Sequence, residues 1–228
     1  MIITIDGPAV SGKSTTALAL AKELNCFYLY SGLLFRAVAY LLHMHEHHDE
    51  DTIASVSEIE MEQYTDYQRL NYRYSIAQGA HMLFDGSDIT AQLHTPLISQ
   101  LASIVGTNRH VRRAIQSLER HIATTVTTGV IIVDGRDSGS VIFPHAEHKF
   151  YMIASLQERA RRMQKDLAAK HVIISYEQAV HEISKRDERD SRRAHHPLTV
   201  PDDAVIIDTT NKTGEEVLKI LLGYIRGS

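Results

Sequence analysis

The chain has one cysteine, Cys26, and no tryptophan among its 228 residues. A single cysteine excludes an intramolecular disulfide and predicts a reducing compartment. We interpret Cys26, next to Phe27, as a small buried apolar residue and not as a catalytic thiol. Because 43% of the residues are hydrophobic, a chain of this length buries a full core without covalent crosslinks, which predicts a single domain over residues 1–228.

Long apolar runs and an excess of basic residues are also absent. No stretch of about 18 uncharged apolar residues occurs, so no transmembrane helix is expected. The N-terminus lacks the basic segment and apolar segment of a signal peptide. The formal net charge of −4 argues against a general nucleic-acid-binding protein. These absences predict a cytoplasmic protein with neither a membrane nor a nucleic acid as its partner.

Five short apolar runs, separated by helical patterns, indicate the strands of one sheet. Most of them lack strict alternation, as expected for strands covered on both faces. The alternation of strand and helix predicts an α/β fold with a five-stranded parallel sheet and helices on both faces. The predicted strands are Ile2–Asp6, Phe27–Tyr30, Gly129–Asp134, Lys149–Ile153 and Ala204–Asp208, and the predicted helices include 14–24, 111–125, 156–169, 176–193 and 213–224.

Two stretches interrupt this alternation and leave a core of residues 1–51, 107–154 and 197–228. Residues 52–106 are an insertion, in which Tyr67–Ile76 and His81–Phe84 predict a hairpin and Thr95-Pro96 predicts a helix start. Residues 155–196 are rich in charge and in arginine. We expect both stretches above the carboxyl edge of the sheet, where they would cover a bound ligand and exclude water from it.

The first predicted strand leads directly into a phosphate-binding motif. Gly7, four further residues and Gly12-Lys13-Ser14 stand between a strand and a helix, a context that argues against a chance match. Backbone N–H groups and the positive end of the helix dipole then point into one concavity. Lys13 adds a charge for the outer phosphates, and the Ser14 hydroxyl suits Mg²⁺.

Polar residues also follow the third predicted strand. Asp134 ends that strand, where P-loop enzymes place a carboxylate linked to Mg²⁺; a turn-capping aspartate is the alternative. In the segment Gly135–Gly139, Arg136 offers a bidentate fork for phosphate, and Asp137 can accept from an amino group or orient the arginine. The alternative for this pair is a surface salt bridge.

Further candidates lie after the second strand and in the arginine-rich stretch. Ser31 and Arg36 suit a second phosphorylated substrate, or are a helix cap and a surface arginine. Arg186, Asp190 and Arg193 share one helix face. Arginines such as Arg186 and Arg193 can stabilise a transferring phosphoryl group. The alternative to this functional interpretation is a solvent-exposed helix whose charges pair with one another. We interpret the histidines at 43, 45, 47 and 48 as a polar helix end and loop, not as a metal site.

Several longer motifs together resemble one family. They are Ile-Thr-Ile-Asp-Gly-Pro-Ala with Ser-Gly-Lys-Ser-Thr (3–15), Ser-Gly-x-x-Phe-Arg (31–36), Asp-Gly-Arg-Asp-x-Gly-x-Val-Ile-Phe-Pro (134–144), Glu-Arg-Ala-Arg-Arg (158–162), Arg-Asp-Glu-Arg-Asp-Ser-x-Arg-Ala (186–194), Pro-Leu (197–198) and Asp-Ala-Val-Ile-Ile-Asp-Thr-Thr (203–210). Nearly end to end, the chain resembles bacterial cytidylate kinases. The resemblance implies a P-loop kinase fold, with 52–106 as an inserted monophosphate-binding subdomain and 155–196 as an arginine-rich lid.

The resemblance also implies an activity and roles for individual residues. The activity is direct transfer of the γ-phosphate of ATP to CMP or dCMP with Mg²⁺. We expect the protein to be a monomer. The implied ATP-binding residues are Gly7, Pro8, Ala9, Val10, Ser11, Gly12, Lys13, Ser14 and Thr15, with Ser14 and Asp134 at the metal. The implied CMP-binding residues are Ser31, Arg36, Ser103, Arg112, Arg136, Asp137, Arg186 and Asp190, among which Ser103, Arg112 and Asp137 resemble the residues that read cytosine. The implied catalytic residues are Lys13, Arg136, Arg159, Arg162 and Arg193.

The chain departs from the family pattern at a few positions. Val10 stands where glycine or alanine is usual, and a β-branched residue tolerates positive φ poorly, which predicts a tighter or differently tilted loop. Tyr30 replaces an aspartate, His94 replaces an arginine, and Ile153 replaces a polar residue. Two other functions stay open: a kinase for another acceptor such as UMP, AMP or shikimate, and a nucleotide-sensing module without catalysis.

Overall fold

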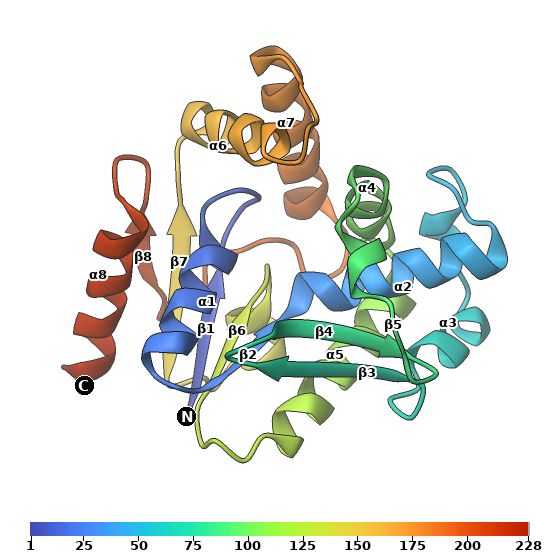
Figure 1. Ribbon diagram of the computed structural model, residues 1–228, viewed down its shortest axis with the longest axis horizontal. Helices are drawn as coiled ribbons and strands as arrows, with labels where there is room; N and C mark the ends of the chain where they lie inside the picture. Colours follow the sequence, from blue (N-terminus) through green and yellow to red (C-terminus); the bar gives the residue numbers. More distant parts are fainter. Residues whose placement is uncertain (228) are drawn as a thin grey trace.

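The computed structural model describes residues 1–227 and contains the predicted parallel sheet (Figure 1). The strand order is β2–β6–β1–β7–β8, and each neighbouring pair is parallel. The strands are β1 (Ile2–Asp6), β2 (Phe27–Tyr30), β6 (Ile131–Asp134), β7 (His148–Ile153) and β8 (Val205–Asp208). Each lies within two residues of its predicted range, and the predicted α/β fold is confirmed.

Helices cover both faces of this sheet. Side chains alternate between the two faces of a strand, so Ile132 and Val133 of β6 belong to different cores. Helices α1 (Lys13–Glu23) and α8 (Gly214–Arg226) pack with Ile132. Helices α2 (Ser31–Glu46) and α5 (Arg109–Thr125) pack with Val133 on the opposite face. Within residues 1–227, no helix combines the length and the apolar character needed to cross a bilayer.

The segment 52–106 forms a second layer over α2 and β2. Its strands β3 (Leu70–Ser75), β4 (Gly79–Phe84) and β5 (Ser87–Asp88) are antiparallel, and its helices are η1 (Ile53–Ser55), α3 (Glu58–Thr65), η2 (Thr90–His94) and α4 (Pro96–Val105). The Tyr72 hydroxyl accepts from the Tyr30 amide at 2.9 Å and donates to the Tyr28 carbonyl at 2.8 Å. The hairpin therefore binds the outer edge of β2. The predicted hairpin and the helix start at Thr95-Pro96 are confirmed.

The arginine-rich stretch forms two helices beyond the carboxyl ends of the strands (Figure 1). These are α6 (Leu156–Ala168) and α7 (Tyr176–Arg192), and a single turn of π-helix, η3 (Ser138–Ile142), follows β6. The two helices pack against each other around Ala160, Ala179 and Ile183. Because this small core is separate from the two cores of the sheet, the pair reaches over the sheet edge as a unit.

Candidate active site

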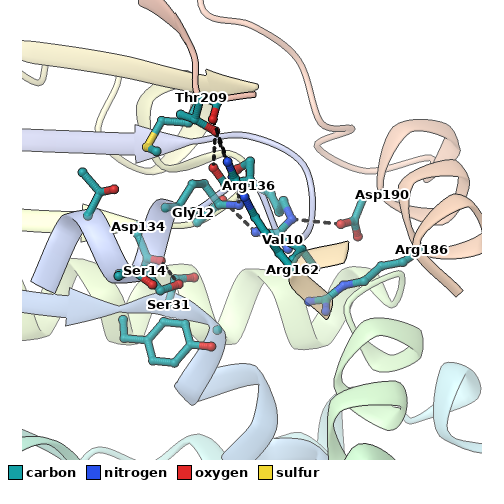
Figure 2. Close-up of a pocket in the computed structure, with 18 of the residues that line it drawn as sticks. Val10, Gly12, Ser14, Ser31, Asp134, Arg136, Arg162, Arg186, Asp190 and Thr209 are labelled. Atoms are coloured by element: carbon teal, nitrogen blue, oxygen red, sulfur yellow. Dashed lines mark hydrogen bonds and ion pairs between the residues drawn. The ribbon is translucent and has the colours of Figure 1, made fainter. Parts of the chain in front are cut away.

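A cavity of about 830 Å³ opens at the carboxyl edge of the sheet, and both arginine-rich helices contribute to its lining; Figure 2 shows a close-up of it. Most of the residues predicted for the site line it. They are Val10, Ser11, Gly12, Lys13, Ser14, Thr15, Ser31, Arg36, Ser103, Arg112, Asp134, Arg136, Asp137, Arg162, Arg186, Asp190 and Arg193. Gly7, Pro8, Ala9 and Arg159 are not among its lining residues. One cavity thus joins the phosphate loop to the residues implied for the second substrate.

The phosphate loop contains three residues in left-handed or related backbone conformations. Gly7 has φ 144°, Val10 has φ 59° and Gly12 has φ 93°. A Cβ atom at Gly7 would lie 2.1 Å from the Met152 carbonyl oxygen, so only glycine fits there. Val10 carries a β-branched side chain in a conformation that is unfavourable for it. That side chain packs against the apolar core between α6 and α7, so the strained position joins the loop to these helices.

Lys13 begins helix α1 and is buried beneath the loop. Its ammonium group donates to the Pro8 carbonyl at 2.6 Å and to the Ser11 hydroxyl at 3.3 Å. Burial lowers the pKa of Lys13 well below its usual value, Arg136 lowers it further, and Asp134 raises it. An anion in the cavity would relieve the desolvation of this charge.

Asp134 lies at the end of β6 and accepts two hydrogen bonds. The Ser14 hydroxyl donates to one carboxylate oxygen, and the Tyr28 hydroxyl donates to the other at 3.0 Å. Burial raises the pKa of Asp134, while the Ser14 hydroxyl and the Lys13 ammonium lower it. Among residues 1–227, no group of three or more His, Cys, Asp or Glu could hold a metal ion. A hard cation at Ser14 and Asp134 would therefore need phosphate and water oxygens to complete its shell.

The residues implied for base recognition converge around Asp137, which is buried. Arg112 donates to Asp137 from one end of its guanidinium and to the Gly106 carbonyl, at 3.0 Å, from the other. Arg193 approaches the second carboxylate oxygen at 3.6 Å. Ser103 accepts a hydrogen bond from Arg189 of α7. Arg189 was not among the predicted site residues, and it connects α7 to helix α4.

The cations around the centre of the cavity are unequally neutralised. Arg136 donates to Asp190 at 2.9 Å. Arg186 extends into the cavity (Figure 2), and its Nε atom is buried without a hydrogen-bond partner in the described chain. Burial and the neighbouring Arg136 lower the pKa of Arg186 to about 10. An arginine in this state has unused donors in a fixed position, which suits an incoming phosphate.

Three other predicted arginines are held by local partners. Arg159 donates to the Ala9 carbonyl at 3.1 Å and to Asp187 at 2.6 Å, behind the loop. Arg162 lines the cavity and bonds Glu158 and Thr209. The guanidinium of Arg36 lies 3.3 Å from the Leu93 carbonyl and 3.5 Å from the His94 ring.

The comparison with known proteins now identifies the family. The family model of the cytidylate kinases matches residues 3–227. The chain belongs to the cytidylate kinase family. The cytidylate kinase of Caldanaerobacter subterraneus is 38% identical and aligns over 98% of this chain and 94% of its own. That of Geobacter sulfurreducens is 36% identical over 99% and 93%. The resemblance read from the motifs, and the prediction of a kinase, are confirmed.

A structural comparison supports the fold alone. A solved structure of an uncharacterized protein from Eubacterium ventriosum superposes with a TM-score of 0.56 at 12% sequence identity, covering 100% of this chain and 99% of that one. At this identity the likeness shows a shared fold. What the kinase does with its cavity rests on its own side chains.

Two buried acids of the kinase support the site and were missed by the sequence analysis. Asp6 accepts from the amides of Ser138 at 3.0 Å and Gly139 at 2.7 Å, and so holds the loop after β6. Burial raises the pKa of Asp6 to about 6. Glu119 is fully buried, and burial raises its pKa to about 8, although the Ser31 hydroxyl and Arg112 lower it. Its position seven residues after Arg112, on the same face of α5, was the available signal.

Replacing Glu119 with glutamine is expected to stabilise the kinase in a pH-dependent way. Below the pKa of about 4.5 that Glu119 has in the unfolded chain, the carboxyl is protonated in both the folded and the unfolded state, so its burial costs no charge-related stability. Between this value and about pH 8, the carboxyl ionises in the unfolded state but not in the folded state. The loss of folding stability caused by Glu119 therefore grows with pH. Glu119→Gln should leave the unfolding temperature unchanged near pH 4.5 and raise the free energy of unfolding by on the order of 4 kcal/mol at pH 8. Thermal unfolding at both pH values measures this.

The exposed Glu62→Gln on α3 serves as the control and should show no comparable pH dependence. A gain in stability of equal size at pH 4.5 and pH 8 would contradict the protonated state that burial imposes on Glu119.

Proposed function

We propose that this kinase transfers the γ-phosphoryl group of ATP to CMP, and to dCMP, with Mg²⁺ bound between protein and donor. The observation that carries the proposal is the single cavity in which the phosphate loop faces Arg186 and the Arg112–Asp137 pair. Phosphoryl transfer needs little covalent chemistry from the protein. It needs two anionic substrates held in line, neutralised and shielded from water.

The donor side of the cavity is the phosphate loop. Its amides, the N-terminus of α1 and the Lys13 ammonium would bind the β- and γ-phosphates. Ser14 and Asp134, which hydrogen bond each other, would hold Mg²⁺ through oxygen atoms. When bound, the ion would neutralise charge on the donor phosphates.

The acceptor phosphate fits the arginines opposite the loop. Within residues 1–227, Arg186 has a buried Nε without a hydrogen-bond partner, and Arg136 has only part of its guanidinium engaged, by Asp190 and the Gly135 carbonyl. Arg36 lies on the wall of the same cavity. A phosphate dianion would satisfy these donors, and the burial of Arg186 would then be compensated by a charge-assisted bond.

Base selection follows from the polarity of the Arg112–Asp137 pair. The Asp137 carboxylate accepts only, which matches the exocyclic amino group of cytosine, whereas Arg112 donates only and matches N3 or the carbonyl oxygen. Ser103 would be the third residue that recognises the base. Uracil presents the opposite polarity at N3 and at the exocyclic position, which would leave buried groups unpaired at a cost of roughly 1–3 kcal/mol each.

The segments 52–106 and 155–196 would cover the active-site cavity during the reaction. Segment 52–106 supplies Ser103 to the acceptor wall, and segment 155–196 supplies Arg162, Arg186 and Arg193 from above. We expect these helices to close over bound nucleotides, as kinases require to exclude water. We propose that the kinase acts in the cytoplasm as a monomer.

A coupled assay for ADP production tests the proposal. With ATP and Mg²⁺, CMP and dCMP should be turned over, and UMP, AMP and shikimate should react at least tenfold more slowly. Equal turnover of CMP and AMP would favour a kinase for another acceptor. Binding of ATP without production of CDP would favour a nucleotide-sensing module.

A further inference from the structure

The Asp-Thr-Thr motif at residues 208–210 has no part in the function proposed above, yet its side chains contact three parts of the donor side. Thr209 follows β8, is 2% exposed and lines the cavity. Its hydroxyl lies 2.9 Å from the Ser11 carbonyl and 3.1 Å from the Ile153 carbonyl, and can donate its one proton to either. The same oxygen accepts from Arg162 at 3.0 Å, and the Thr209 carbonyl accepts from Arg162 at 2.6 Å (Figure 2).

The residues on either side of Thr209 anchor the start of helix α6. Asp208 accepts from the amide of Thr210 at 2.9 Å and from its hydroxyl at 2.6 Å. The Thr210 hydroxyl in turn accepts from the Ser155 amide at 2.9 Å. Ser155 is the N-cap of α6 and accepts from the Glu158 amide. The motif therefore fixes the base of the helix that carries Arg162.

The contact with Ser11 also controls the direction of a phosphate-loop amide. A trans peptide is planar, so the carbonyl of Ser11 and the N–H of Gly12 point in opposite directions. With the carbonyl held by Thr209, the Gly12 N–H points away from Thr209. Gly12 has φ 93° and no Cβ atom, so no side chain of its own opposes rotation of this peptide.

We propose that Thr209 is a positioning residue for the phosphoryl donor: its hydroxyl holds the Ser11–Gly12 peptide and the Arg162 guanidinium in the orientation that receives the donor phosphates. The inference rests on the proposed function for the identity of the donor. It assigns Thr209 no contact with the reacting atoms. Its effect passes through two groups, one on the loop and one on α6, that are brought together by one oxygen atom.

Thr209→Val tests the inference because it keeps the shape of the side chain and removes the hydroxyl. We expect the dissociation constant for ATP with Mg²⁺, measured by calorimetry without acceptor, to rise about tenfold, as for the loss of one such hydrogen bond. The catalytic constant should fall as well, while KM for CMP changes less than twofold. Thr209→Ser, which keeps the hydroxyl, should restore ATP affinity to within about twofold of the wild-type value.

The matched control is Thr65→Val on α3, which removes a hydroxyl that donates to a backbone carbonyl at 2.8 Å away from the cavity lining. It should change neither constant. Wild-type ATP affinity in Thr209→Val, equal losses for ATP and CMP, or a Thr209→Ser variant as weak as Thr209→Val would each overturn the inference. If Thr209→Val does not fold, Thr209→Ala must show the same selective loss for ATP.

This design separates the inference from the proposed function. If the wild-type kinase binds ATP but does not phosphorylate CMP, the proposed function is wrong, and the ATP affinities of the variants still decide the role of Thr209. If CMP is phosphorylated and Thr209→Val equals the wild type, only the role of Thr209 is wrong.

Discussion

Replacing Lys13 with alanine is expected to lower kcat for CMP phosphorylation by about two to three orders of magnitude, the usual cost of losing one preorganised charge at a transition state. The ammonium is buried and bonded to the loop that would hold the donor, so it needs no reorganisation when charge develops. Coupled steady-state kinetics at saturating ATP and CMP measure the loss.

The fold should survive this change, because burial and Arg136 both disfavour the Lys13 charge before an anion binds. We therefore expect an unfolding temperature equal to or above that of the wild type. Lys22→Ala, which removes an exposed lysine from the same helix, is the matched control and should keep wild-type kcat. A Lys13→Ala variant that is folded and retains more than a tenth of the wild-type kcat would refute the assigned role.

Replacing Asp137 with asparagine is expected to change the choice of base. The buried carboxylate contacts Arg112 and Arg193, and its loss removes the acceptor that we propose for the cytosine amino group. We expect kcat/KM for CMP to fall about 10- to 100-fold, the cost of one or two buried hydrogen bonds, with KM for ATP nearly unchanged. Because a carboxamide can both donate and accept, the ratio of CMP to UMP turnover should fall as well.

The control for this variant is Asp203→Asn, which breaks the ion pair with Lys149 outside the cavity lining. It should leave both nucleotide constants unchanged. Since breaking a buried ion pair costs about 3–5 kcal/mol of stability, the unfolding temperature of Asp137→Asn must be measured beside its kinetics. An unchanged KM for CMP in a folded Asp137→Asn would show that Asp137 does not read the base.

Local signals explain why much of this architecture was predictable. The five strands are short apolar runs bounded by turn residues, and the phosphate loop is a contiguous motif, so each depends on neighbours within about ten residues. Helix starts such as Thr95-Pro96 depend on one cap and one proline. The segment 52–106 was predicted as an inserted unit, but its apolar side chains share one core with α2 and α5, which no local pattern indicates.

Local sequence patterns could not predict which residues the site residues contact. Tyr28 was not singled out, because its bond to Asp134 depends on β2 lying directly beside β6 in parallel register. Arg189 was one arginine among many in α7 until the structure placed it against Ser103. Glu119 was an acidic residue in a charged helix, and only burial makes its protonation unusual.

The sequence by itself determined the phosphate loop, the order of strands and helices along the chain, and the membership of the family, because all three are written in contiguous residues. The tertiary structure decided which polar groups meet: Ser14 with Asp134, Arg112 with Asp137, and Thr209 with Ser11 across 198 positions of the chain. The physical reason is that parallel strands are joined by long crossovers. Groups at the carboxyl edge of the sheet are therefore close together in space although they are far apart in the sequence.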